Sequence, residues 1–154
     1  MKKNQPAMPY PIELKNIFFT RSIVVAVPSH VPDGTQLVNI SPTNSIEIKM
    51  VEGHEDQYAV TMQTLFNQEN ETSAPYMIDV ECIALFKVDT TISEEERIKR
   101  LTITGHSVVY GAIREAVAWI TSRQPYGPLN LGLSILNHVT KPADNESQTQ
   151  TKTS

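Results

Sequence analysis

Hydrophobic and polar positions alternate along the chain in segments that have the period of half-buried β-strands. The first segment, residues 12–27, contains no proline and is rich in β-branched and aromatic residues, which favours a long strand. Its alternation slips between Leu14 and Ile17, so we expect a one-residue bulge within residues 15–18. That bulge would bring all the apolar positions onto one face: Ile12, Leu14, Ile17, Phe19, Ile23, Val25 and Val27.

Three further strands are predicted between residues 46 and 87. Residues 46–50 and 58–66 alternate cleanly and are separated by a turn that contains Gly53, which predicts a β-hairpin. Residues 76–87 form the last strand, with Tyr76 beginning one apolar face. Its second half is apolar on both faces, which predicts that this end of the sheet is covered on both sides.

A long helix follows the strands. Ser93 is placed as its N-cap and Glu96 as the partner in a capping box. One apolar stripe contains Val109, Ile113, Ala116, Val117 and Ile120, and a second contains Val108, Ala112 and Trp119. A helix that is apolar on most of its circumference must be buried on two sides. Either a second copy of the chain or its own C-terminal segment would supply the second cover.

Two irregular segments also carry apolar residues. Residues 28–43 are rich in proline and form a predicted crossover loop, which contains Val31, Leu37, Val38 and Ile40. Residues 129–139 are rich in leucine and form a last apolar element. We therefore expect a flexible N-terminus over residues 1–11, a single domain over 12–140 and a disordered polar tail over 141–154.

Composition adds limits to this picture. The 154 residues correspond to about one domain, and the lone Cys82 excludes a disulfide framework and a cysteine-based zinc site. The N-terminus runs into Pro6 without an apolar signal region, and no segment approaches the roughly 18 apolar residues of a membrane span. We expect a soluble, cytoplasmic protein that does not insert into membranes.

Charge is distributed unevenly along the chain. Residues 44–96 carry 12 acidic and two basic residues, whereas both flanking segments are net basic and the whole chain has a net charge of -4. This balance argues against nucleic acid as the main partner. The acidic middle segment is either a solvated face or a docking surface for a basic partner.

No catalytic, cofactor or metal site is expected. The histidines at 30, 54, 106 and 138 have no partner at metal-ligand spacing, and the glycines match no nucleotide-binding fingerprint. Cys82 alternates inward among apolar residues, as a core thiol does. The feature that remains is surplus apolar surface, which marks a binding site unless folding and oligomerisation bury all of it.

One part of the sequence resembles a known family. The run IREAVAWITSR at 113–123, followed by PYGPLNL at 125–131, is similar to the signature region of the SecB family of export chaperones. The resemblance extends over about residues 12–139. It implies an α+β fold in which a four-stranded antiparallel sheet precedes a long helix and a short C-terminal helical element. It also implies a homotetramer built as a dimer of dimers, with Val108, Ala112 and Trp119 at the oligomer interface.

The resemblance implies an ATP-independent holdase, which binds unfolded precursor proteins and hands them to SecA for export. Adaptable apolar surfaces suit such a role. By position, the client groove would be lined by the crossover loop, the second strand and the closing element, although each of these residues could equally belong to the core. The groove candidates are Val31, Leu37, Val38, Ile40, Ile46, Ile48, Met50, Leu133 and Leu136.

The chain departs from the family at the SecA-docking face. Asp79 falls at one acidic position of that face, but Ser22 and Ala26 occupy two others. These departures leave room for a SecB-like chaperone of a toxin-antitoxin module. From other classes, the alternatives are a hot-dog-like thioesterase and a structural oligomer or ligand-binding barrel. The thioesterase would have Glu115 as its only visible catalytic acid on the helix, and Glu115 is expected to form an ion pair with Arg114.

Overall fold

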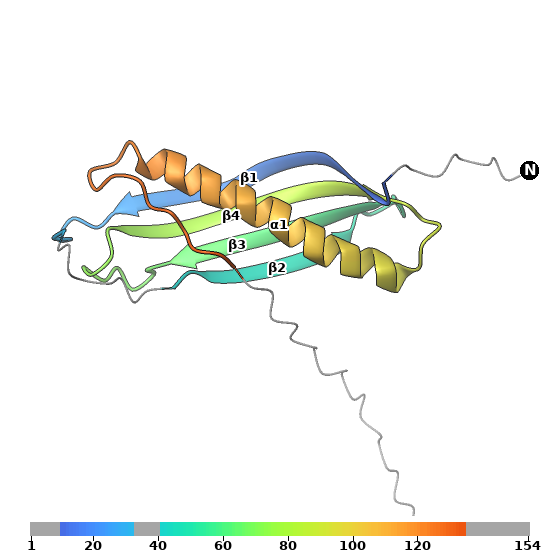
Figure 1. Ribbon diagram of the computed structural model, residues 1–154, viewed down its shortest axis with the longest axis horizontal. Coiled ribbons are helices and arrows are strands. Elements are labelled where there is room, and N and C mark those ends of the chain that lie inside the picture. The colour runs from blue at the N-terminus through green and yellow to red at the C-terminus, as the bar shows by residue number, and fades with distance from the viewer. Residues whose placement is uncertain (1–9, 33–40, 135–154) are drawn as a thin grey trace, which may run out of the picture.

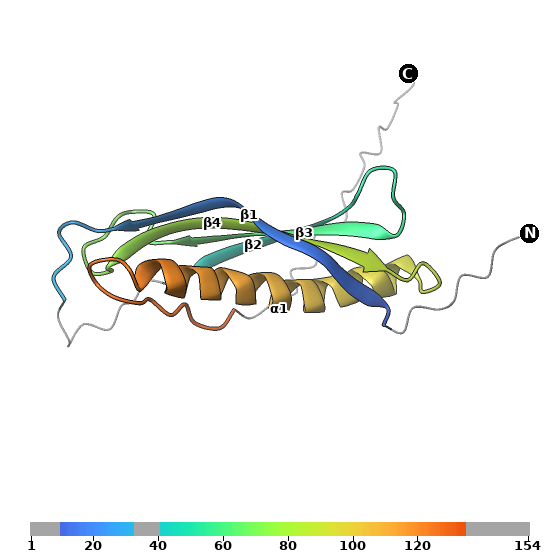
Figure 2. The ribbon, with the colours of Figure 1, turned by 90° about the horizontal axis from the view of Figure 1, so that it is seen from above.

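A computed structural model describes residues 10–32 and 41–134 of the chain. Four antiparallel strands form one sheet in the order β1-β4-β3-β2, and a single long helix lies on one face of it (Figures 1 and 2). The elements are β1 (Ile12–Ala26), β2 (Thr43–Met50), β3 (Gln57–Phe66), β4 (Tyr76–Val88) and α1 (Glu94–Thr121). This architecture confirms the predicted α+β fold.

The sheet has a covered inner face and an open outer face. Every second residue of β4, from Tyr76 to Val88, is buried on the inner face, as the alternation predicts. Ile83 and Leu85 point to the outer face and stay partly exposed, because α1 covers only the inner face and no other described element covers the outer one. Among the described residues of the single chain, the prediction that this end of the sheet is covered on both sides is therefore wrong.

Strand β1 contains two bulges. The first lies at Lys15, within the predicted window, and the second lies at Thr20, where the pattern gave no sign of one. Because a single extra residue exchanges the two faces of a strand, Ile23 and Val25 point to the outer face, opposite Asp79 and Met77. The prediction that Ile23 and Val25 share the inner face with the other apolar residues of β1 is thus wrong. Ser22, Val24 and Ala26 lie on the inner face instead.

The second and third strands form the predicted hairpin. Strands β2 and β3 pair antiparallel, and Gly53 in their connection has a φ of +78°, which is costly for any residue with a Cβ. At the opposite end of β3, Asn67 has a φ of +53°. Its side chain bonds the backbone of Glu71 in both directions, which fixes the turn into β4.

Helix α1 begins as predicted, but its capping box is incomplete. The Ser93 hydroxyl accepts a hydrogen bond from the Glu96 amide at 3.2 Å, as an N-cap does. The Glu96 carboxylate does not return to Ser93; it accepts from Arg100 Nε at 2.8 Å instead. The predicted stripe is buried at Val109, Ile113 and Val117, whereas Ala116 and Ile120 are half-buried.

The helix crosses the sheet diagonally, with its first half over β2 and β3 and its last half towards β4 and β1 (Figure 1). After the helix, residues 128–134, here called the strap, run back beside α1 without regular secondary structure. The predicted C-terminal helical element is wrong for residues 129–134, which belong to the strap and form no helix, and the rest of that element, residues 135–139, lies outside the described residues. So do the tail and all but Tyr10 and Pro11 of the N-terminal segment.

Candidate functional site

Exposed apolar side chains are the most conspicuous surface feature of the described chain. One group lies on strand β1, at an edge of the sheet, with exposures of 39–48%: Leu14, Phe18, Phe19, Ile23 and Val25. Another group comes from the predicted groove, where Val31 is 74%, Met50 55% and Leu133 84% exposed. Patches of this kind on a folded chain mark surfaces that bind something.

The groove candidates do not converge on one pocket. Ile46 and Ile48 are partly buried and pack against the core. Val31 follows the end of β1 and Met50 ends β2, and because these two strands run in opposite directions, the two residues lie towards opposite ends of the sheet. Strand β2 alone extends over about 24 Å at the usual rise per residue. The arrangement is an elongated surface, which suits an extended polypeptide better than a compact ligand. Leu37, Val38, Ile40 and Leu136 lie outside the described residues.

Four side chains on one side of α1 hold the strap. We call them the ladder: Thr121, Arg114, Tyr110 and His106. The Leu129 amide donates to Thr121 Oγ1 at 2.8 Å, and Arg114 Nε donates to the Leu131 carbonyl at 2.9 Å. The Tyr110 hydroxyl donates to the Gly132 carbonyl at 2.6 Å. His106 Nε2 lies 3.0 Å from Ser134 Oγ. The strap therefore runs antiparallel to the helix and is bonded along most of its length.

A second polar chain ties the end of the strap to the sheet. Asn44 of β2 donates from Nδ2 to Ser134 Oγ at 3.0 Å and accepts from Thr64 Oγ1 at 2.7 Å. Thr64 is fully buried and His106 is 8% exposed. Burial lowers the pKa of His106, because the charged imidazolium loses its hydration. The helix, β2 and β3 thus meet the strap at Ser134.

Another cluster fixes the start of the crossover segment. The Tyr126 hydroxyl donates to the Val27 carbonyl at 2.7 Å, and the His30 ring packs edge-on against Tyr126 at 4.9 Å. The Tyr76 hydroxyl donates to the Gly127 carbonyl at 2.6 Å. The turn after α1 and the end of β1 are therefore held together, which orients residues 27–32, including Val31.

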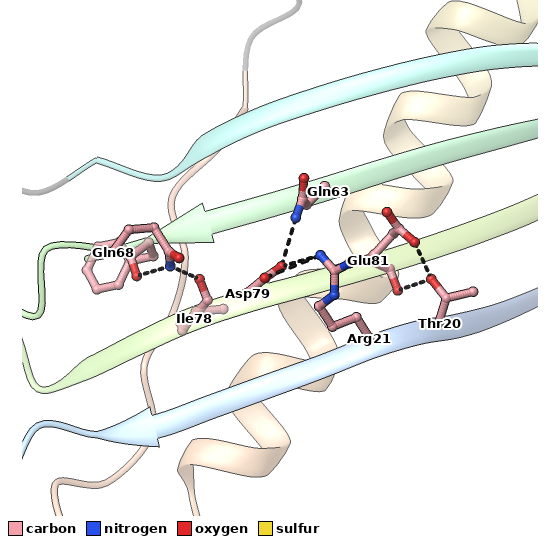
Figure 3. A network of polar contacts seen from close by, with 8 residues as sticks. Thr20, Arg21, Gln63, Gln68, Ile78, Asp79 and Glu81 are labelled. Atoms are coloured by element: carbon pink, nitrogen blue, oxygen red, sulfur yellow. Dashed lines mark hydrogen bonds and ion pairs between the residues drawn. The ribbon is translucent and has the colours of Figure 1, made fainter.

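The outer face carries paired charges instead of a free acidic patch. Figure 3 shows Arg21 of β1 against Asp79 of β4, with Nη1 3.2 Å from Oδ1, and Gln63 Nε2 donating to the same oxygen at 2.9 Å. Thr20 Oγ1 donates to Glu81 Oε1 at 2.6 Å. Asp79, the SecA-docking candidate, is accessible on this face, but its charge is offset by Arg21.

The oligomer-interface candidates divide into two kinds. Val108 and Ala112 are partly buried and pack against the core, whereas Trp119 is 61% exposed, with the Arg123 guanidinium 4.4 Å from its ring centre. At about 100° per residue, this stripe lies on a different side of α1 from the ladder. The described part of the C-terminal segment therefore leaves Trp119 uncovered.

The ladder was missed by sequence reasoning. Arg114 was expected to pair with Glu115, but its guanidinium bonds the strap carbonyl, so that prediction is wrong. The available signal was the spacing of His106, Tyr110 and Arg114, which are four residues apart and therefore share one side of a helix.

The described residues offer little for covalent or metal chemistry. They contain no group of three or more His, Cys, Asp or Glu residues placed to hold a metal ion. Burial raises the pKa of the Cys82 thiol to about 11, so this thiol is protonated at neutral pH. Within the part of the chain that the structure describes, no helix is long and apolar enough to span a membrane.

One solved structure among the comparisons with known proteins supports the fold. No family model matches the chain, and no curated protein matches it. Among solved structures, it resembles a SecB-like chaperone of Mycobacterium tuberculosis, determined in complex with a ChAD peptide from the HigA1 antitoxin. The TM-score is 0.61 at 21% identity, over 80% of this chain and 91% of that one. A Streptococcus agalactiae protein of unknown function gives 0.49 at 8% identity, over 79% and 97% of the two chains. The chain therefore has a SecB-like fold.

Proposed function

We propose that this protein is an ATP-independent chaperone that holds unfolded or extended polypeptides. The observation that carries the proposal is the amount of apolar surface that a SecB-like fold leaves exposed here. Twelve large apolar side chains are exposed among the described residues, including Val31, Met50 and Leu133 along the elongated surface. Burying such surface against a client's apolar residues supplies affinity without nucleotide hydrolysis.

The client that we favour is a dedicated polypeptide partner, such as an antitoxin. The Mycobacterium tuberculosis structure, which shares the fold, was solved with an antitoxin peptide. Transfer of precursors to SecA is the second candidate. The pairing of Asp79 with Arg21 weakens this second candidate, because a basic docking segment would have to compete with an internal guanidinium.

We further propose that the chain assembles as a homotetramer, a dimer of dimers. Strand β1 is a 15-residue edge strand with exposed apolar side chains on both of its faces. An edge of this kind pairs with another chain unless it is protected. Trp119, on the uncovered side of α1, supplies a separate apolar contact for a second interface.

The test uses the full chain, without nucleotide, titrated into a fluorescent, chemically unfolded polypeptide while anisotropy is recorded. Val31→Asp and Met50→Asp should each weaken binding by about tenfold, because each places a charge on the apolar surface. Both side chains are exposed, so the fold should be unaffected. Tyr10→Ser, which removes an exposed aromatic side chain outside the groove candidates, serves as the matched control.

The same assay distinguishes the two kinds of client. A dedicated chaperone should bind its antitoxin segment more tightly than it binds unrelated unfolded secretory precursors. Equal affinity for many precursors, together with measurable SecA binding, would favour the export role. Absence of binding to any unfolded polypeptide would contradict both.

A further inference from the structure

We propose that the ladder on α1 is a binding site for the main chain of an extended apolar polypeptide, and that the strap occupies it as an internal competitor of the client. A client segment with apolar residues at alternate positions would displace the strap and take over its hydrogen bonds. This inference rests on the proposed chaperone function and adds to it a second binding site and the way that access to it is controlled.

The ladder contacts atoms that nearly any polypeptide provides. Three of its four hydrogen bonds involve backbone groups of the strap: the Leu129 amide and the Leu131 and Gly132 carbonyls. Only the fourth, at Ser134, involves a strap side chain. Recognition through the main chain is largely independent of sequence, which is what binding to varied clients requires.

Side-chain selection at the ladder is confined to two positions. Leu131 is 3% exposed and Leu129 packs partly against the core, whereas Leu133 is 84% exposed. At Gly132, an added Cβ would meet no atom within 4 Å, so the site would accept a side chain there. Asn130, which lies between Leu129 and Leu131, is exposed. The ladder therefore fits two apolar residues separated by one residue of any kind, the alternation of an extended chain.

The spacing of the ladder matches an extended partner at the step from His106 to Tyr110. His106 and Tyr110 are four residues apart, about 6.0 Å along a helix. Their strap partners, Ser134 and Gly132, are two residues apart, about 6.6 Å along an extended chain. These two distances agree, so a client in extended form could replace the strap over this step. At the next step Tyr110 and Arg114 are again four residues apart while their partners Gly132 and Leu131 are adjacent, so the match to an extended chain is limited to the segment from Gly132 to Ser134.

Competition by the strap has a measurable consequence. If a client binds only the fraction of molecules in which the strap is released, the apparent Kd equals the intrinsic Kd divided by that fraction. Weakening the strap should therefore tighten client binding. A strap that only supports the client surface would have the opposite effect, because loosening it would weaken binding.

Tyr110→Phe is the most direct variant. It removes the hydroxyl that bonds Gly132 and keeps the ring in place. Loss of one such hydrogen bond should increase the released fraction, and therefore the client affinity, by about two- to tenfold. Ser107→Ala is the matched control, since that hydroxyl lies on the same helix and bonds only Ile103. Its client affinity should be unchanged.

Hydrogen exchange gives an independent readout. Client binding to the wild-type chain should accelerate exchange at strap amides such as that of Leu129, whereas binding elsewhere would leave them unchanged or slower. Weaker or unchanged binding by Tyr110→Phe, with the strap still protected in the complex, would overturn the proposal while leaving the chaperone function intact. Failure of the wild-type chain to bind any client would instead reject both.

Discussion

Gly105 is the residue at which α1 approaches the sheet most closely among the described glycines. A Cβ at this position would lie 2.9 Å from Val60 Cγ2 and 3.1 Å from Val60 Cγ1, and Val60 is fully buried on β3. The absence of a side chain therefore determines how near the helix lies to the core. A buried valine cannot move aside without disturbing its own neighbours.

Replacement of Gly105 by alanine should therefore destabilise the fold by about 1–3 kcal/mol, through overpacking. Gly111→Ala is the matched comparison, because its Cβ would meet nothing within 4 Å. That change should stabilise the helix by up to about 1 kcal/mol. Urea unfolding of both variants would measure the difference, and equal effects of the same sign would contradict this account of the contact.

His106 should make the stability of the chain depend on pH. Burial lowers its pKa in the folded state, so the unfolded chain binds this proton more readily. The stabilisation is complete above the unfolded pKa of about 6.5 and is lost as the pH falls from there through the lower folded value. Unfolding measured between pH 7.5 and 5 should show a smaller loss for His106→Gln than for the wild-type chain. An identical loss in both would show that His106 titrates normally.

The amino-acid sequence alone predicted much of the hydrophobic core but not the contacts of the ladder with the strap. Alternation correctly indicated the buried face of β4, because burial of apolar groups dominates where a side chain points. The partners of Tyr110 and Arg114 could not be predicted in the same way. They are backbone carbonyls of the strap, and a carbonyl has no sequence signature.

The N-terminus of α1 gives a prediction at the level of an element. Ser93→Ala should cost about 1 kcal/mol, because the Glu96 amide would lose its acceptor. Glu96→Gln should cost at most about 0.5 kcal/mol, since its carboxylate is engaged only with Arg100 on the surface. Thermal unfolding separates the two, and a larger loss for Glu96→Gln would indicate that a complete capping box forms in solution.

Strand β1 shows where sequence patterns are insufficient for an element. The bulge at Lys15 was predictable because apolar residues on both sides of it changed parity. The bulge at Thr20 was not, since Ile23, Val24 and Val25 are all apolar and fit either face. Arg21 comes directly after this second bulge, and the bulge determines that its side chain lies beside Asp79. The paired charges of the outer face therefore could not be predicted either.

The whole molecule is expected to be an assembly of several copies of the chain. The chain should elute as a tetramer, and Trp119→Ser should lower the mass measured by light scattering at equal concentration, because an exposed apolar contact is lost. Ser107→Ala, also exposed on α1 but on a different side of the helix from Trp119, should leave the mass unchanged. A monomeric wild-type chain would show that the edge of β1 and Trp119 serve other partners.

Topology was the most predictable property of the whole molecule, because four alternating segments before one long helix allow few compact arrangements. The client surface was less predictable. Ile46 and Ile48 pack partly against the core, while Val31, Met50 and Leu133 are exposed. The sequence pattern does not distinguish an apolar residue of the core from one on a binding surface. Only the diagonal path of α1 and the return of the strap beside it decide which side chains are covered.

Binding of unfolded polypeptides is tested by light scattering behind a sizing column, with the full chain mixed with a chemically unfolded polypeptide in the absence of nucleotide. A chaperone of this kind should elute together with the polypeptide, and the polypeptide should no longer aggregate. Separate elution with unchanged aggregation, for antitoxin segments and secretory precursors alike, would contradict the proposed chaperone function.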